Sequence, residues 1–544
     1  MLLRQIARGG KNTAAKRVKI SAIAIFSLAV SRRKLYNARV PRAERLAARS
    51  KAFAQRIKED FMTKEKSFFK NLSKPVDLTK GSPWKVLLLY GAPIMLSYFL
   101  QQIYVLTDAI ICGQTLTAGQ VAGVNDTSPL TFIFLQFAFG CTSGFSVITA
   151  KRVGLNDEKG VRRSFAAQIY LTIIVSAVLT VLSIILLPWL LGVINVTPTN
   201  KEVYDAAYSY CFVIFLGIVT QMGYNFVCGI LRSYGDSLTP LVFLVISTAI
   251  NVALDIFFLA VLKSGPSGAA VATVITQFLS MAGCFVYTMI KYKSLRLKKE
   301  DFKCSASELL NHLKQGLPLG LQFSILAIGI IVMQGGVVKF DIDANGIMLP
   351  LTPAQNGVGA ANKLINFLMS FFNGLGVAIL GFNAQNLGKG NYDAIKKGTL
   401  QSLIIMLVIS FVCLATGFGL SIGGAYQYIF MSAEKITAES IKYGNILVYV
   451  DFALYFVLGF LIVVRSAVQG ICKSGYVLGA GIMELAARIL ICVFLPPLIN
   501  GGAITSTASS AAFAGLCFAD PGAWILASLL LLAPLFKNII GKKY

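Results

Sequence analysis

The sequence predicts an all-α integral membrane protein with twelve transmembrane helices in two six-helix bundles related by a parallel internal repeat. Of the 544 residues, 56% are hydrophobic and 14% are charged, and the mean hydropathy is +0.70. A soluble domain is about 45–50% apolar and about 25% charged. Twelve apolar stretches follow one another, and three short motifs recur in the same order. The composition excludes a cytosolic enzyme, a disulfide-rich secreted protein and a disordered chain.

The first 61 residues differ in composition from the rest. They hold 16 of the 50 Lys and Arg residues and 3 of the 24 acids, so they carry +13 of the net charge of +26. We interpret residues 1–61 as a basic extension, either disordered or preceding a natural start at Met62, and residues 62–84 as a cytoplasmic lead-in. The apolar run Ile20–Val30 leaves open a targeting segment, although it is too short to span a bilayer. The remaining charge lies mostly in loops, so we do not expect nucleic-acid binding.

Each apolar stretch contains about 20 residues or more, which is enough for a tilted helix to cross a bilayer. Short polar loops separate the stretches. The expected spans are 85–111, 121–149, 165–194, 203–231, 238–262, 267–290, 313–338, 355–385, 397–420, 440–469, 476–499 and 515–536.

Lys and Arg gather in alternate loops, which predicts the orientation of the chain, because cytoplasmic loops retain these residues. Five lie between residues 151 and 163, seven between 291 and 314, and three between 389 and 397. The loops after the first and eleventh spans contain none. We therefore expect a multi-pass protein of the plasma membrane, with both termini in the cytoplasm.

Three motifs recur at similar offsets. Residues 149–163 resemble residues 383–397, at an offset of 383 − 149 = 234. The other two pairs are Gly91-Ala-Pro93 with Gly316-Leu-Pro318, and Val121-Ala-Gly-Val-Asn125 with Val358-Gly-Ala-Ala-Asn362. Because each half contains six spans and begins on the same side, the two form a parallel repeat, which is common in secondary transporters. We expect a first lobe at 85–290, a cytoplasmic linker at 291–312 and a second lobe at 313–544.

The sequence lacks the motifs of several enzyme classes. It has no phosphate-binding loop, no Cys-x-x-Cys pair and a single histidine, His312, which we expect to be solvated in the linker. The ten cysteines mostly fall inside spans and are interpreted as small apolar residues. These features argue against nucleotide hydrolysis, a catalytic triad and a zinc site. We expect no enzyme activity, no cofactor and no resident metal.

Four polar residues inside the spans form a candidate ion-coupling site. A charge in mid-bilayer costs at least about 2.5–3.5 kcal/mol, so Asp108 and Asp255 need a functional or structural reason. Asn251 precedes Asp255 by four residues, which places both side chains on one helical face. With Thr273 of the next span, this set could hold a proton or Na⁺, since hard cations prefer oxygen ligands. The alternative is polar contacts that hold helices together.

The remaining buried charges have structural interpretations. Arg232 with Asp236, and Glu484 with Arg488, are each four residues apart and are expected to pair along their helices. Asp451 is expected to be solvated or to face a cavity. Neither Asp108 nor Asp255 has an acidic counterpart in the second half of the repeat, which favours an ion site confined to the first half.

Pro93 is expected to kink the first span, because a proline inside a helix leaves a carbonyl without its hydrogen bond. Asp108 lies on the same predicted helix. We therefore hypothesise that protonation of Asp108 changes how this helix bends.

Together these motifs resemble the multidrug and toxic compound extrusion (MATE) family over residues 84–540. The segments that carry the resemblance are Gly91-Ala-Pro93 with Asp108 and Gly113, Leu231-Arg-Ser-Tyr-Gly-Asp-Ser-Leu-Thr-Pro240, Asn251-Val-Ala-Leu-Asp255 and Gly268-Ala-Ala-Val-Ala-Thr273. The resemblance implies two helical bundles around a V-shaped cleft. It also implies alternating-access efflux of organic cations or amphipathic drugs in exchange for H⁺ or Na⁺.

The resemblance also assigns roles. It implies that Asp108, Asn251, Asp255 and Thr273 form the ion-coupling site, and that Pro93 is the kink proline. A second branch of the family carries acids in the second lobe, where this chain has Leu326 and Leu458, so that site is absent here. The alternative function is a lipid-linked oligosaccharide flippase of the same superfamily, which would need a cationic cavity.

Overall fold

The computed structural model describes residues 75–541. Its contacts divide the chain after Lys74, and the described residues belong to the unit Pro75–Tyr544. The predicted extension 1–61, with its alternative of a targeting segment, and most of the lead-in 62–84 lie outside the described residues. Within them the regular secondary structure is helical, apart from an isolated β-bridge between Ile342 and Met348, and loops join the helices.

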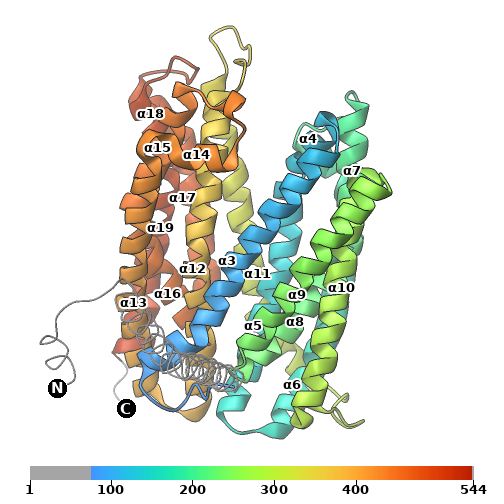
Figure 1. Ribbon diagram of the computed structural model, residues 1–544. Coiled ribbons are helices and arrows are strands. Elements are labelled where there is room, and N and C mark those ends of the chain that lie inside the picture. Colours follow the sequence, from blue (N-terminus) through green and yellow to red (C-terminus); the bar gives the residue numbers. More distant parts are fainter. Residues whose placement is uncertain (1–74, 542–544) are drawn as a thin grey trace, which may run out of the picture. The chain divides into compact units, whose positions relative to one another are not determined.

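Two successive sets of helices make up this unit (Figure 1). The first set comprises α3 (Pro83–Thr115), α4 (Ala118–Asp126), α5 (Ser128–Gly154), α6 (Glu158–Val193), α7 (Lys201–Leu216), α8 (Ile218–Ser233), α9 (Leu238–Asp255), the π-helix η1 (Ile256–Val261) and α10 (Gly265–Lys291). The second comprises α11 (Ala306–Val338), α12 (Pro353–Lys389), α13 (Tyr392–Ser421), α14 (Ala425–Phe430), α15 (Ala438–Ala453), α16 (Tyr455–Gly470), α17 (Ser474–Asn500), α18 (Ser510–Cys517), α19 (Ala519–Leu535) and the π-helix η6 (Phe536–Ile540). Short 3₁₀ turns are η2 (Lys293–Leu295), η3 (Lys339–Asp341), η4 (Ile422–Gly424) and η5 (Ala433–Lys435).

The prediction of twelve membrane spans is confirmed. Within residues 75–541, ten helical segments are long and apolar enough to cross a membrane, and two bent pairs bring the number to twelve. The bent pairs are α7 with α8, at 44°, and α15 with α16, at 53°. Large apolar side chains remain exposed on the flanks, among them Ile185 at 70% and Leu498 at 77%, where lipid would cover them.

His312 is buried inside α11, so the expectation of a solvated linker residue is wrong. The helix begins at Ala306 because the side chain of Ser305 accepts the N–H of Glu308 at 3.2 Å. His312 is 0% exposed, and its Nε2 lies 2.7 Å from Ser164 Oγ of α6. Its Nδ1 lies 2.8 Å from the Glu308 carbonyl oxygen. The histidine therefore ties α11 to the first set of helices.

Local structure repeats with the same offsets as the sequence, which confirms the parallel repeat. The breaks in the two bent pairs fall at Gly217 and Leu454, and 454 − 217 = 237. The caps of α6 and α13 are Asp157 and Asn391, and 391 − 157 = 234; each side chain accepts a backbone N–H three residues later. These corresponding breaks and caps show that both halves fold by the same local rules.

The first helix of each half crosses to the other half. α3 packs on α12 and α13 of the second half and on α9 of the first, and α11 packs on α5 and α6 of the first half and on α17 of the second. Glycines permit this close approach. A Cβ on Gly374 would lie 2.5 Å from Met95 Cα, and one on Gly140 would lie 2.7 Å from Gly320 Cα.

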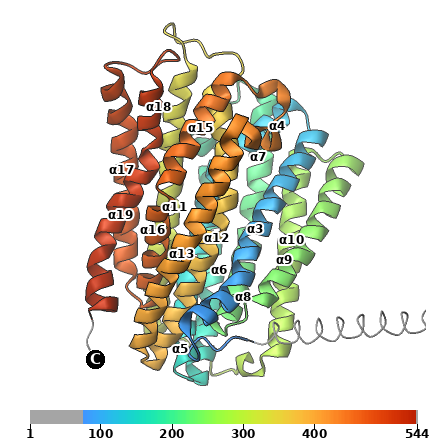
Figure 2. The same ribbon diagram turned by 60° about the vertical axis from the view of Figure 1, so that its left-hand side comes forward.

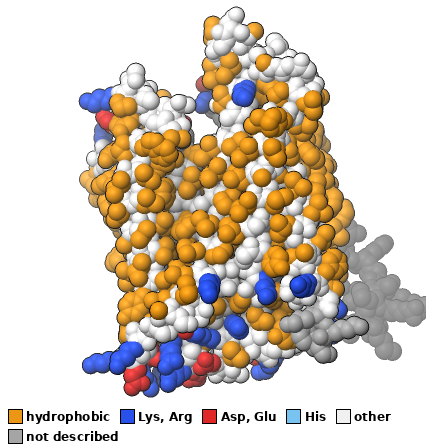
Figure 3. Space-filling view, turned by 180° about the vertical axis from the view of Figure 1, so that it is seen from behind, with side chains coloured by type: hydrophobic (Ala, Val, Ile, Leu, Met, Phe, Trp, Pro, Cys, Tyr) orange, Lys and Arg blue, Asp and Glu red, His pale blue; other side chains and the backbone are white. Residues whose placement is uncertain are grey.

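The two sets of helices meet at one end of the unit and separate toward the other (Figures 1 and 2). Figure 3 shows Lys and Arg gathered at the first end and a hollow between the two parts at the second. We call the first end, where the loops 155–157, 292–305 and 390–391 lie, the basic end. There Gly154 of α5 and Gly388 of α12 contact each other's helices. A Cβ on Gly154 would overlap the Gln385 carbonyl oxygen, and one on Gly388 would overlap the Lys151 carbonyl oxygen.

Candidate functional site

The candidate ion site lies where α3 passes α9 in the first half. Asp255 is the last residue of α9, and the chain continues as the π-helix η1. π-Helical turns inside membrane helices often mark functional positions. Asn251, one turn earlier, and Asp255 are both 0% exposed. Asp108 of α3 is half-buried beside them, and its carboxyl group is close enough to interact with that of Asp255.

These polar groups are not satisfied by the surrounding protein. Several side-chain atoms here have no hydrogen-bond partner among the described residues. They are both carboxylate oxygens of Asp255, Oδ1 and Nδ2 of Asn251, and Oδ1 of Asp108. A buried polar group without a partner costs about 1–3 kcal/mol, and a charged group costs more. The donor set of three side chains, rich in oxygen, therefore fits a proton or a small hard cation.

Thr273 reaches the site through a residue that the sequence did not single out. Tyr104 Oη lies 3.4 Å from Thr273 Oγ1, which links α3 to α10. Tyr104 precedes Asp108 by four residues, about one helical turn. This spacing places both side chains on one face of α3 and could have identified Tyr104 from the sequence. The structure thus brings together Asp108, Asn251 and Asp255, with Thr273 joined to them by Tyr104.

Pro93 lies toward the basic end of α3, far from Asp108. The two residues are 15 positions apart, which is about 22 Å along a helix. The Pro93 carbonyl accepts the hydroxyl of Ser97 at 2.8 Å. Two residues before it, Gly91 packs against Ala378 of α12, with 3.2 Å between an added Cβ and the alanine Cβ. The proline therefore lies in the part of α3 that contacts the second half.

The prediction that Arg232 pairs with Asp236 is wrong. α8 ends at Ser233 and the chain turns at Gly235, with φ of +78°, so Asp236 points to α10. Its Oδ2 accepts Lys291 Nζ at 2.7 Å and the hydroxyl of Tyr292 at 2.9 Å. Burial and the neighbouring Asp236 carboxylate raise the pKa of Tyr292 above its usual range.

Arg232 instead lines a small polar pocket between the halves. The pocket lies among α3, α5, α8 and α12 and is lined by Tyr90, Phe139, Ser143, Ser146, Ala150, Asn225, Gly229, Arg232, Ser233, Val377, Leu380 and Gly381. Within residues 75–541 the guanidinium has no ion-pair partner, and its Nε is buried without a hydrogen bond. A cation therefore lies where the two halves meet.

The second half also departs from the expected pairing. Glu484 pairs with Arg465 of α16, and Arg488 Nε binds Asp520 Oδ1 of α19 at 2.6 Å. Glu484 and Arg488 are correctly spaced on α17, but each finds a partner on another helix. Asp451 is 2% exposed, so the expectation that it is solvated or faces a cavity is also wrong.

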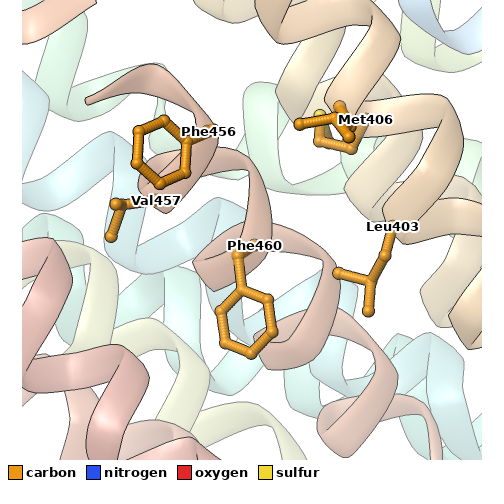
Figure 4. Close-up of a pocket in the computed structure, with 6 residues that line it drawn as sticks. Leu403, Met406, Phe456, Val457 and Phe460 are labelled. Atoms are coloured by element: carbon orange, nitrogen blue, oxygen red, sulfur yellow. The ribbon is translucent and has the colours of Figure 1, made fainter. Parts of the chain in front are cut away.

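A larger pocket is purely apolar. It has a volume of about 330 Å³ and lies between α13 and α16 (Figure 4). Its lining residues are Leu403, Met406, Leu407, Phe456, Val457 and Phe460. Because the lining has no titratable group and Phe456 is 51% exposed, this pocket suits an apolar chain such as that of a lipid. It is not part of the ion site.

Two six-helix bundles with broken spans and a pair of carboxyl groups between two of the helices are typical of a secondary transporter. The MatE family model matches residues 93–257 and 356–496. The chain therefore belongs to the MATE family of multidrug efflux transporters.

Relatives with curated names agree with this family. The "Probable multidrug resistance protein YpnP" of Bacillus subtilis is 28% identical over 58% of this chain and 68% of its own length. The "FAD transporter" of Shewanella oneidensis is 24% identical over 60% and 70%, respectively. These relatives are transporters, and their names do not favour the flippase alternative.

Solved structures share the fold. An outward-facing multidrug resistance MATE transporter has a TM-score of 0.72 at 19% identity, over 85% of this chain and 98% of its own. A Pyrococcus furiosus transporter, described as having a binding pocket of reverse polarity, has a TM-score of 0.73 at 19% identity, over 86% and 99%.

Proposed function

We propose that this protein is an antiporter of the plasma membrane that exports organic cations or amphipathic drugs in exchange for H⁺ or Na⁺. The observation that carries the proposal is the buried carboxyl of Asp255 beside the half-buried Asp108, with neither oxygen of Asp255 and not Oδ1 of Asp108 hydrogen-bonded among the described residues. Two adjacent carboxylates repel each other, so the pair favours binding of a proton or cation. The proposed ligands are Asp108, Asn251, Asp255 and, through Tyr104, Thr273.

Coupling would run through α3. This helix carries Asp108 beside α9, and its other end packs on α12 of the second half. Loading the site removes the repulsion between the carboxyl groups, which lets α3 move relative to α9. Alternating access would then open the basic end. Because cytoplasmic loops retain Lys and Arg, we place the basic end and both termini in the cytoplasm.

The positive charge of Arg232 would influence which substrates bind. Its guanidinium would repel a purely cationic compound near the meeting point of the halves, but would bind a carboxylate or phosphate. Amphipathic zwitterions therefore belong beside organic cations in the first set of compounds to test.

Replacing Pro93 with alanine is expected to weaken ion-driven efflux, because the added N–H restores a hydrogen bond and straightens α3. The measurement is the dependence of efflux on the imposed gradient in inside-out vesicles. Gly113→Ala, with open space around it on the same helix, is the matched control. Unchanged gradient dependence in Pro93→Ala would contradict a role for the kink.

The decisive experiment is uptake of a fluorescent cation by inside-out vesicles containing the full chain. The vesicles are prepared from cells that lack their own drug efflux pumps. Either lumenal acidification or an outward-directed Na⁺ gradient is then imposed. Uptake driven by acidification would support proton antiport. Uptake driven only by the Na⁺ gradient would support the same site with Na⁺ as the coupling ion. No response to either gradient would overturn the proposal.

A further inference from the structure

The apolar pocket between α13 and α16 lies within the second half, away from the candidate ion site. All six of its lining side chains are apolar and come from these two helices (Figure 4). Leu407 is 45% exposed and Phe456 is 51% exposed, so both lie where lipid would cover them. The volume of about 330 Å³ is at the lower end of the range for small-ligand pockets. An apolar chain from the surrounding membrane therefore fits this pocket.

A cation lies on the same face of α13 as the pocket, toward the basic end. Lys396 precedes Leu403 by seven residues and Leu407 by eleven, and these spacings return to one face of a helix. Leu400, which is 39% exposed, lies between Lys396 and Leu403 on that face. At about 1.5 Å per residue, the backbone of Lys396 is about 10 Å from that of Leu403 and about 16 Å from that of Leu407. A partly exposed apolar track thus runs from a cation into the pocket.

Two more lysines lie close to this end of α13. Lys397 follows Lys396 in the helix, and Lys537 lies in η6, which packs on α13. Within residues 75–541, none of the three lysines has a hydrogen bond or an ion pair. α13 contains one acid, Asp393, and η6 contains none, so the two elements carry a charge of 3 − 1 = +2. Positive charge without a protein partner therefore borders the apolar track.

The combination of a cationic group and an apolar pocket matches the two parts of an anionic phospholipid. Lysine ammonium groups attract the phosphate of a lipid head group, and basic sites between membrane helices on the cytoplasmic side bind such head groups. The hydrocarbon core of a bilayer is about 30 Å thick, so each leaflet supplies about 15 Å. An acyl chain whose head group lies at Lys396 would therefore pass Leu400 and reach the pocket at Leu403 and Leu407. Both ends of the ligand are thus accounted for by one surface.

We propose that this surface binds one anionic phospholipid from the leaflet at the basic end. Its phosphate lies at Lys396, Lys397 and Lys537, and one acyl chain occupies the pocket between α13 and α16. The bound chain fills a space that the side chains of the two helices leave open, and so stabilises their packing. The head group reduces the repulsion among the three lysines. This inference does not depend on the ion or the substrate of the proposed antiport.

The test is native mass spectrometry of the full chain, purified in a mild detergent and titrated with dioleoylphosphatidylglycerol. Dioleoylphosphatidylcholine has the same chains without the net charge, and glycerol 3-phosphate has the charge without the chains. We expect one tightly bound phosphatidylglycerol, weaker binding of phosphatidylcholine and no binding of glycerol 3-phosphate. Each lysine near an anionic lipid is worth roughly a fivefold change in affinity.

Lys396→Gln should therefore weaken binding of phosphatidylglycerol roughly fivefold, and replacing Lys396, Lys397 and Lys537 together should weaken it about 100-fold. Lys201→Gln removes an exposed lysine of α7 in the first half and should leave the affinity unchanged. Equal affinity of the wild type for the two phospholipids would overturn the proposal, as would unchanged affinity in the triple variant.

A variant that fills the pocket tests the position of the acyl chain. Leu403→Phe places a ring in the pocket and should lower the affinity for both phospholipids, whereas Ile404→Phe, at a neighbouring position that is 63% exposed, should not. Unchanged lipid binding by Leu403→Phe would contradict the proposed position. If this variant fails to fold, the lysine variants still test the site. A dimer that excludes lipid in the same spectra would also overturn the proposal, because a second copy of the chain would then cover this surface.

Discussion

Asp255→Asn is expected to abolish ion-driven accumulation of dye while leaving the amount of protein in the membrane unchanged. Asparagine keeps the shape of the side chain but cannot carry the charge that a proton or Na⁺ neutralises. One monovalent ion moving through 100 mV supplies about 2.3 kcal/mol, a roughly 50-fold concentration ratio. Losing one coupled ion should therefore lower the steady accumulation ratio by about that factor.

The measurement is dye uptake by inside-out vesicles under the gradient that drives the wild type. Asp205→Asn removes an exposed acid of the same half and serves as the matched control. Asp108→Asn should reproduce the loss, because both carboxyl groups belong to one site. Full gradient-driven uptake by Asp255→Asn would refute the assignment of the site.

Gly388→Ala is expected to open the basic end. The added methyl group would overlap the Lys151 carbonyl oxygen across the contact between α12 and α5. Overpacking of this kind costs about 1–3 kcal/mol, which is roughly a 5- to 150-fold shift in population. Gly359→Ala on the same helix meets no atom within 4 Å and should have no effect.

Cys472 reports this opening directly. It packs at the basic end beside Val147 and Ala384, and burial raises the pKa of its thiol above the usual range. In the packed state less of the reactive thiolate is present at neutral pH. Maleimide labelling of Cys472, in a Cys304→Ser background, should therefore accelerate in Gly388→Ala. An unchanged labelling rate would show that the contact does not hold the basic end closed.

The sequence predicted the spans and the repeat because both depend on local composition and spacing. Asn251 and Asp255 were found for the same reason, since four residues on a helix define one face. Ion pairs between different helices could not be predicted in this way, because spacing along one helix does not show which helices pack together. Arg488 and Glu484 have ideal spacing, yet each binds a residue from another helix. Asp236 was misplaced because the turn at Gly235 directs it to Lys291, and His312 because the helix start at Ala306 was missed.

The crossing of α3 to the second half has a consequence for biosynthesis. α3 is made before α12, and its Gly91 and Met95 pack on Ala378 and Gly374, which are made about 280 residues later. At about 5–20 residues per second, roughly 15–60 s separate the synthesis of the two surfaces. During that time the face of α3 that will pack on α12 has only lipid or a chaperone against it. A nascent chain stopped before α12 would expose this surface, and the cell's quality control would meet it as an unassembled membrane helix.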